Sequence, residues 1–106
     1  GNDEPDRMHA QLEIELNAPS IVVNAAGKAQ MQATLRNVGG VPANEVVAQP
    51  FISGFARHYG CGTQRIGQLA PGRAKTVSWG LTGLPRQRPH PIHLAAGAEN
   101  AATRWK

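Results

Sequence analysis

The sequence predicts a small all-β domain made of antiparallel strands. In the segment 28–38, apolar residues alternate with polar ones, at Ala29, Met31, Ala33 and Leu35. A period of two is that of a strand with one buried face. The segment 76–82 repeats the pattern with Val77, Trp79 and Leu81, and it follows an Ala70-Pro71-Gly72 turn. The chain also has 12 Gly, 8 Pro and only 5% aromatic residues, which favours many turns and little helix.

The remaining strands follow from the same alternation, read between turns. Leu12, Ile14 and Leu16 alternate with polar residues, and Ile21 begins a short β-branched segment that continues the first strand or pairs at a sheet edge. The segment 45–53 is apolar but contains Pro50, which predicts a bulge or an edge there because proline cannot donate to a ladder. Further strands are expected at 64–69, 73–84, 92–96 and 101–106.

This makes about seven strands, with the spacing typical of an immunoglobulin-like antiparallel β-sandwich with Greek-key connections. Trp79 lies in the inward register of its strand, so we expect it in the core. For Trp105 two interpretations stay open. It closes the core, or it is exposed and offers a platform for sugar stacking.

The length of 106 residues predicts one domain with a single core. The first seven residues are polar and acidic and contain Pro5, so residues 1–9 are expected to form a flexible N-terminal linker and residues 10–106 the folded domain. The sequence contains no run of about 18 apolar residues, so no membrane-spanning helix is predicted. The start lacks a basic and apolar signal region, which fits a cytoplasmic protein or a mature chain without its leader.

The charge balance is basic, with 11 Lys and Arg against 7 Asp and Glu. Three of the acids lie in the first six residues, so the folded part is more basic than the net charge of +4. Such a balance favours weak attraction to polyanions. Cys61 is the only cysteine, which excludes an intramolecular disulfide and a zinc site built from Cys-x-x-Cys pairs.

Three turns, taken in order, carry a family resemblance. They are Asn37-Val38-Gly39 after a strand, Leu69-Ala70-Pro71-Gly72 before the strand with Trp79, and Glu99-Asn100 before the last strand. Together they resemble the CARDB-type domains, the cell-adhesion-related immunoglobulin-like modules of bacterial and archaeal secreted proteins. The resemblance covers about Leu12 to Trp105. The segments 55–63 and 86–91 and the Ala-rich final hairpin depart from it.

The resemblance implies a non-catalytic adhesion or accessory module outside the cytoplasm, in the periplasm, at the cell surface, secreted or in a lipoprotein. It carries no catalytic residues and no cofactor to this chain. We therefore expect a binding or spacer module of an exported bacterial protein, with a protein or a cell-surface polysaccharide as partner.

Two irregular segments are the expected recognition loops, because binding residues concentrate on loops held by a rigid scaffold. They are the Gly-rich stretch 55–63 and the Pro-spaced basic stretch 86–91, with the candidate binding residues Arg57, His58, Tyr59, Arg86, Arg88 and His90. Strand addition at the edge near Pro50 is a further expected mode of binding.

A small periplasmic copper- or zinc-binding protein is an alternative, with His58, Cys61 and either His90 or His93 as ligands. His90 and His93 differ by an odd number, however, so a regular strand would turn them to opposite faces. Surface histidines and a free thiol are the plain interpretation. Cys61 with His58 as base would need an orienting acid and an oxyanion hole, and no motif for either is present, so no enzyme is predicted.

A polyanion binder is the other alternative, through Arg86 and Arg88. Further basic residues would join them in one patch if the two loops lie together: Arg57, Arg65, Arg73 and Lys75. The plain interpretation is a set of solvated positive loops. Nucleic-acid recognition is not expected, because only Phe55 and Tyr59 are candidates for base stacking.

Overall fold

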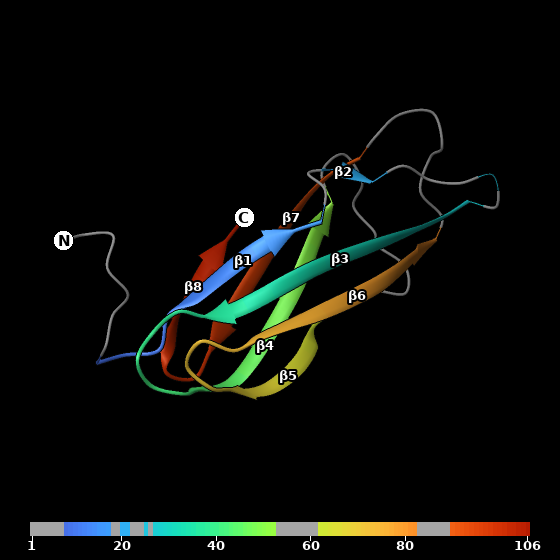
Figure 1. Cartoon of the computed structure of the whole chain (residues 1–106). Helices are drawn as coiled ribbons and strands as arrows, with labels where there is room; N and C mark the ends of the chain where they lie inside the picture. The colour runs from blue at the N-terminus through green and yellow to red at the C-terminus, as the bar shows by residue number, and fades with distance from the viewer. Residues whose placement is uncertain (1–7, 18–19, 22–24, 26, 53–61, 83–89) are drawn as a thin grey trace.

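A computed structural model describes residues 8–17, 20–21, 25, 27–52, 62–82 and 90–106 of the chain. These residues form eight strands and no helix (Figure 1). The strands are β1 (Leu12–Leu16), β2 (Ser20–Ile21), β3 (Lys28–Asn37), β4 (Ala43–Ile52), β5 (Gln64–Leu69), β6 (Ala74–Thr82), β7 (His90–Ala98) and β8 (Ala101–Trp105). Within these residues, no helix is long and apolar enough to cross a membrane.

The strands form two antiparallel sheets that face each other. The first sheet has the order β1-β3-β6, and the second has the order β2-β7-β4-β5, with β8 also paired to β7. Neighbours in sequence such as β3 and β4, or β5 and β6, belong to different sheets, so the chain crosses repeatedly between the layers. This is the predicted immunoglobulin-like β-sandwich. It differs in detail by the two-residue β2, which pairs with the start of β7.

The alternation of the sequence is realised as alternation of burial. In β3, Met31, Ala33 and Leu35 are buried, and in β6 Trp79 is only 2% exposed. The Trp79 indole N–H donates to the carbonyl oxygen of Gly62 at 2.8 Å, so its one polar atom is satisfied inside the core. The other buried apolar residues, from both sheets and the turns, are Ala10, Leu12, Ile14, Ala43, Val46, Ala48, Leu69, Val77, Ile92, Leu94 and Ala96.

The irregularity expected at Pro50 lies earlier in β4. The register between β4 and β5 shifts between Ala43 and Val47, and Glu45 there has a positive φ of 51°. Pro50 itself is buried opposite Leu94 of β7. In the described residues β5 pairs with β4 only as far as Ala48, so the missing N–H of Pro50 interrupts no bond to β5.

Asn37 ends β3, as the sequence predicts, but its side chain is fully buried. Its Oδ1 accepts from the backbone N–H of Gly39 at 2.9 Å and of Gln11 at 3.3 Å. Its Nδ2 donates to the carbonyl oxygens of Val41 at 2.7 Å and Leu69 at 2.9 Å. One amide thus uses both donors and two acceptor positions, which is what burial of a polar group requires. It ties the start of β1, the β3–β4 connection and the end of β5 together.

The turn before β6 matches its sequence prediction. Arg73 N–H donates to the carbonyl oxygen of Ala70 at 3.0 Å, and Gly72 has a φ of +76°. Pro71 in the second position and a positive φ in the third define a type II turn. Gly72 N–H also donates to the carbonyl oxygen of Asn37 at 2.7 Å, which fixes the turn against the end of β3.

The N-terminal boundary is partly visible. His9 accepts a backbone hydrogen bond from Gly40 at 3.1 Å, and Ala10 is buried. Residues 1–7 of the predicted linker lie outside the described residues, so the linker remains a prediction.

Candidate binding surface

Most of the candidate binding residues lie outside the described residues. These are Arg57, His58, Tyr59, Cys61, Arg86 and Arg88. The structure does place the strands to which their segments are joined. The segment 53–61 follows the end of β4 at Ile52, the segment 83–89 precedes the start of β7 at His90, and Ile52 pairs with Ile92. Both predicted loops are therefore attached at the same end of the second sheet.

His90 and His93 both lie on β7. His93 is exposed and lies opposite Phe51 of β4, whereas His90 pairs with Ile21 of β2. The Nδ1 of His93 lies 3.1 Å from the carbonyl oxygen of Lys106. Because a carbonyl oxygen only accepts, Nδ1 is the donor in this bond. Among the described residues, no group of three or more His, Cys, Asp and Glu could hold a metal ion.

The basic residues expected to form one patch are divided between the two sheets. Arg65 is exposed on β5, where it pairs with Val47 of the second sheet. Lys75 lies on β6 of the first sheet, and Arg73 directly precedes β6. These three residues therefore do not share one sheet, and a common patch with Arg86 and Arg88 remains a prediction.

A pair of exposed aromatic rings marks the outer face of the second sheet. Phe51 is 37% exposed and Trp105 is 65% exposed. Their ring centroids are 5.2 Å apart and their planes are inclined by 38°. Phe51 lies on β4 and Trp105 on β8, the two strands that flank β7. Ala95 of β7 lies opposite Trp105, and its small side chain leaves room for the two rings to meet across the central strand.

The sequence alone leaves Trp105 open between core and surface, and it assigns no role to Phe51. The structure decides for the surface. Trp105 is the last residue of β8, and this strand gives only a weak alternation signal because every position after Ala101 is exposed. The proximity of Phe51 and Trp105 depends on strand order, since 53 residues separate them in the chain.

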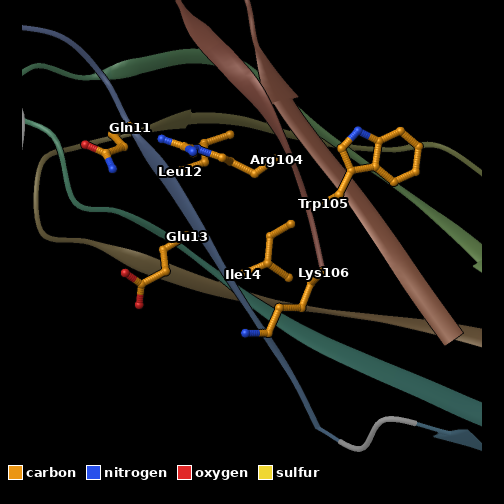
Figure 2. A pocket seen from close by; sticks show the side chains of 7 residues that line it. All are labelled: Gln11, Leu12, Glu13, Ile14, Arg104, Trp105 and Lys106. Carbon is orange, nitrogen blue, oxygen red and sulfur yellow. The ribbon is translucent and has the colours of Figure 1, made fainter. Parts of the chain in front are cut away.

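A second surface feature is the groove between the edge strands β1 and β8 (Figure 2). Its cavity of about 270 Å³ is lined by Gln11, Leu12, Glu13, Ile14, Arg104, Trp105 and Lys106. Figure 2 shows Arg104 directed back toward β1, whereas the ring of Trp105 points away from the groove. Alternation along the chain thus places Arg104 and Lys106 at the groove and the ring of Trp105 on the outer face.

The described acidic residues do not form a pair for acid–base chemistry. Glu13 and Glu15 are exposed on the same face of β1, and Glu45 and Glu99 lie near the β4–β5 irregularity and in the β7–β8 turn. In the described part of the chain we find exposed aromatic and cationic groups suited to non-covalent contact, and no assembled nucleophile, base and oxyanion site.

No family model matches the sequence, and no curated protein matches it. Solved structures do match. A CARDB domain of the PF1109 protein from Pyrococcus furiosus, solved with di-metal ions, matches with a TM-score of 0.66 and 17% identity, over 89% of this chain and 75% of that chain.

Two β-glucosidases also contain a similar fold. The Listeria innocua enzyme, solved in complex with isofagomine, matches with a TM-score of 0.53 and 14% identity over 91% of this chain. The Kluyveromyces marxianus enzyme, solved with glucose, matches with a TM-score of 0.52 and 17% identity over 92% of this chain. This chain spans only 16% and 14% of those enzymes.

At such identities the likeness concerns the backbone arrangement. It confirms, at the level of the fold, the resemblance carried by the turns at Asn37, Pro71 and Asn100. The chain therefore has the immunoglobulin-like fold of a CARDB domain.

Proposed function

We propose that this chain is a non-catalytic binding or spacer module of an exported bacterial protein. Its fold is that of a non-catalytic immunoglobulin-like module, similar to the CARDB domain of PF1109. In the β-glucosidases the similar region is a small share of a long chain, which supports a modular role. The compartment is the periplasm, the cell surface or the medium, by analogy with the secreted proteins in which CARDB-type domains occur.

The partner is a protein or a cell-surface polysaccharide. The observation that carries this proposal is the exposed pair of Phe51 and Trp105 on the outer face of the second sheet. Aromatic rings that remain in water on a sheet surface are typical of recognition sites, because they add large apolar contact area at low conformational cost.

The loops 55–63 and 86–91 complete the proposed surface. The segments that contain them are joined to β4 and β7 at the end of the sheet where Phe51 lies, since Phe51 precedes Ile52, the last residue of β4. The candidate residues Arg57, His58, Tyr59, Arg86, Arg88 and His90 would then extend the contact beyond the two rings. Scaffold strands with variable loops at one end are the usual arrangement of recognition in such sandwiches.

The experiment is a binding assay of the purified chain on isolated cell envelope of the source bacterium. Parallel samples of envelope are treated with protease or with periodate, which destroys vicinal diols of sugars. We expect saturable binding that one of the two treatments abolishes, and that treatment names the class of partner. Absence of saturable binding to untreated envelope contradicts a recognition role.

A loop exchange tests the placement of the site. The variant replaces 55–61 and 86–89 by Gly-Ser sequences of equal length and leaves the described strands intact. We expect a loss of envelope binding of about tenfold or more if the loops carry central contacts. Full binding by the variant would show that the loops are not the site.

A further inference from the structure

We propose that the free edge of β1 binds an extended peptide in which basic and acidic side chains alternate. The peptide would lie in the groove between β1 and β8 and add one strand to the first sheet. This goes beyond the proposed function, because the aromatic pair lies on the outer face of the second sheet. It uses only residues that the structure describes.

The ladder between β1 and β3 determines which backbone groups point into the groove. Val38 N–H donates to the carbonyl oxygen of Gln11 at 2.8 Å, and Asn17 N–H donates to a carbonyl oxygen of β3 at 3.1 Å. Ladder bonds of an antiparallel pair recur at every second residue, so the odd-numbered positions of β1 bond to β3. The backbone groups of Leu12 and Ile14 therefore point away from β3, toward the groove that these residues line.

This edge of β1 is regular and open to pairing. In the described residues β1 pairs with β3 alone, over five residues and without a shift of register. Cavities of about 260, 270 and 390 Å³ follow along it from His9 to Leu16, with β8 and Lys106 on the other side. A row of outward N–H and C=O groups is matched by the backbone of another extended chain, so the class of ligand that fits is a polypeptide.

The other edge strands of the described sheets carry features that hinder such pairing. β5 shifts its register against β4 and contains Gly67 with a φ of +87°. β8 shifts its register against β7, and β2 has only two residues. On β6, the carbonyl oxygen of Ser78 accepts a hydrogen bond from the side chain of Gln64. Irregular, short or capped edges resist the addition of a strand, so β1 is the edge best suited to it.

Two cationic side chains form the opposite wall of the groove. Arg104 and Lys106 line it, and Figure 2 shows Arg104 directed back toward β1. Leu12 is 2% exposed and Ile14 is 6% exposed, so in the described structure side chains, rather than a paired strand, shield this edge from water. Arg104 and Lys106 are themselves exposed, and their flexible stems can turn aside without opening the core. A strand beside β1 would direct every second side chain toward them, where acidic groups are favoured.

Two carboxylates lie on the other face of β1. Glu13 and Glu15 are exposed there, beside the positions that the outward side chains of an added strand would occupy. Arg36 lies opposite Glu13, but its Nη1 donates to the carbonyl oxygen of Gly72 at 3.0 Å. Opposite charges on neighbouring strands stabilise a sheet, so basic side chains are favoured at the outward positions of the ligand.

The same carboxylates disfavour a second copy of this chain at the edge. If two β1 strands paired antiparallel about Ile14, Glu13 of each copy would lie opposite Glu15 of the other. Like charges directly opposite each other destabilise a strand pair. The edge therefore favours a peptide with basic residues on one face and acidic residues on the other.

The test compares two peptides of the same length and composition, Ac-KEKEKEKE-NH2 and Ac-KKEEKKEE-NH2. Only the first keeps all its basic side chains on one face of a strand and all its acidic side chains on the other. We expect the first peptide to bind the purified chain in a calorimetric titration at low salt. The second peptide should bind about tenfold more weakly, because half of its side chains would meet a like charge.

Amide hydrogen exchange, measured residue by residue by NMR, reports the position of the bound strand. In the free chain the amide protons of Leu12 and Ile14 should exchange faster than those of Glu13 and Glu15, which the ladder bonds to β3. Saturation with Ac-KEKEKEKE-NH2 should slow the exchange at Leu12 and Ile14 by about tenfold or more. The exchange at Glu13 and Glu15 should change little.

Matched variants test the charges of β1. Glu13→Lys combined with Glu15→Lys should weaken binding of Ac-KEKEKEKE-NH2 by about tenfold. Glu45→Lys combined with Glu99→Lys makes the same change in net charge outside the residues that line the groove, and it should leave binding unchanged. All four side chains are exposed, and unaltered thermal unfolding of each variant establishes that the fold is intact.

Reversing the charges of the opposite wall as well should restore binding. When Arg104→Glu and Lys106→Glu are added to Glu13→Lys and Glu15→Lys, the alternating peptide can shift by one residue and meet opposite charges on both walls. For a variant that melts early, Glu13→Gln combined with Glu15→Gln replaces it and should weaken binding by about threefold.

Three results would overturn the inference. They are absent or equal binding of the two peptides, unchanged exchange at Leu12 and Ile14 with Ac-KEKEKEKE-NH2 bound, and slow exchange of both amides in the free chain. Slow exchange at every concentration of the chain would mean that a segment of this chain covers the edge, and slow exchange only at high concentration would mean that a second copy does. The loop-exchange variant should bind the peptide as the original chain does, so failure of the proposed recognition site leaves this inference intact.

Discussion

Replacing Asn37 by alanine tests whether one buried amide holds three parts of the sandwich together. The side chain makes four hydrogen bonds, to Gly39, Gln11, Val41 and Leu69. Removing it leaves backbone groups without partners in a region where Asn37 itself is fully buried. Two of the four bonds, to Gly39 and Leu69, are buried and two are partly buried.

The expected loss of stability follows from the number of buried and partly buried hydrogen bonds that Asn37→Ala removes. A buried backbone group left unsatisfied costs about 1–3 kcal/mol, and a partly buried bond contributes about 0.5–1.5 kcal/mol. Water entering the vacated space offsets part of the loss. We expect Asn37→Ala to lower the free energy of unfolding by about 3–5 kcal/mol, a large share of the roughly 5–15 kcal/mol of a domain this size.

The assay is urea unfolding followed by the emission of buried Trp79, together with a thermal melt. The expected loss corresponds to a decrease in Tm of at least about 12 °C. The control is Asn17→Ala, because Asn17 makes an exposed bond of 3.3 Å to Gln32 and should lose less than about 0.5 kcal/mol. A loss below about 1 kcal/mol for Asn37→Ala, or an equal loss for both variants, would refute the reasoning.

Three further predictions concern other parts of the fold. A Cβ on Gly39 would overlap the backbone carbonyl oxygen of His9. Gly39→Ala should therefore lower the free energy of unfolding by about 2 kcal/mol or more, measured by urea unfolding. Gly80→Ala, with nothing within 4 Å of the added atom, should be neutral or slightly stabilising; equal effects would contradict this. Trp79→Phe removes the 2.8 Å indole hydrogen bond and leaves a cavity. The free energy of unfolding, measured by urea unfolding, should therefore fall by about 2–4 kcal/mol. A double-mutant cycle of Phe51→Ala and Trp105→Ala should give a coupling energy of about 0.5–1.5 kcal/mol, and zero coupling would mean that the rings do not interact in solution.

The burial of Asn37 follows from its position in the strand and not from its residue type. Asn37 continues the inward register of Met31, Ala33 and Leu35, so period two already placed its side chain in the core. Its polar character and the following glycines favoured a turn instead. The strand does end there, but the amide turns inward because backbone groups from distant segments meet it, and no sequence pattern states where those groups are.

The candidate site was predictable in part. The sequence predicts Trp105 to be either a core residue or an exposed platform, whereas Phe51 carries no signal of its own. The two rings meet because β4 and β8 pair with opposite edges of β7, around the small Ala95. Pro50 predicts a bulge or an edge. The bulge lies earlier in β4, near Glu45, where φ is 51°, and in the described residues β5 pairs with β4 only as far as Ala48, so Pro50 lies beyond that pairing.

The order of residues along this chain was enough to determine the strands, their inward faces and the Pro71-Gly72 turn, since alternation and turn chemistry are local properties of neighbouring residues. Only the tertiary structure decided which strands lie side by side, how Asn37 is satisfied and that Phe51 and Trp105 form one surface. Pairing between segments far apart depends on the burial of both sheets at once, and that balance of free energy is a property of the whole domain.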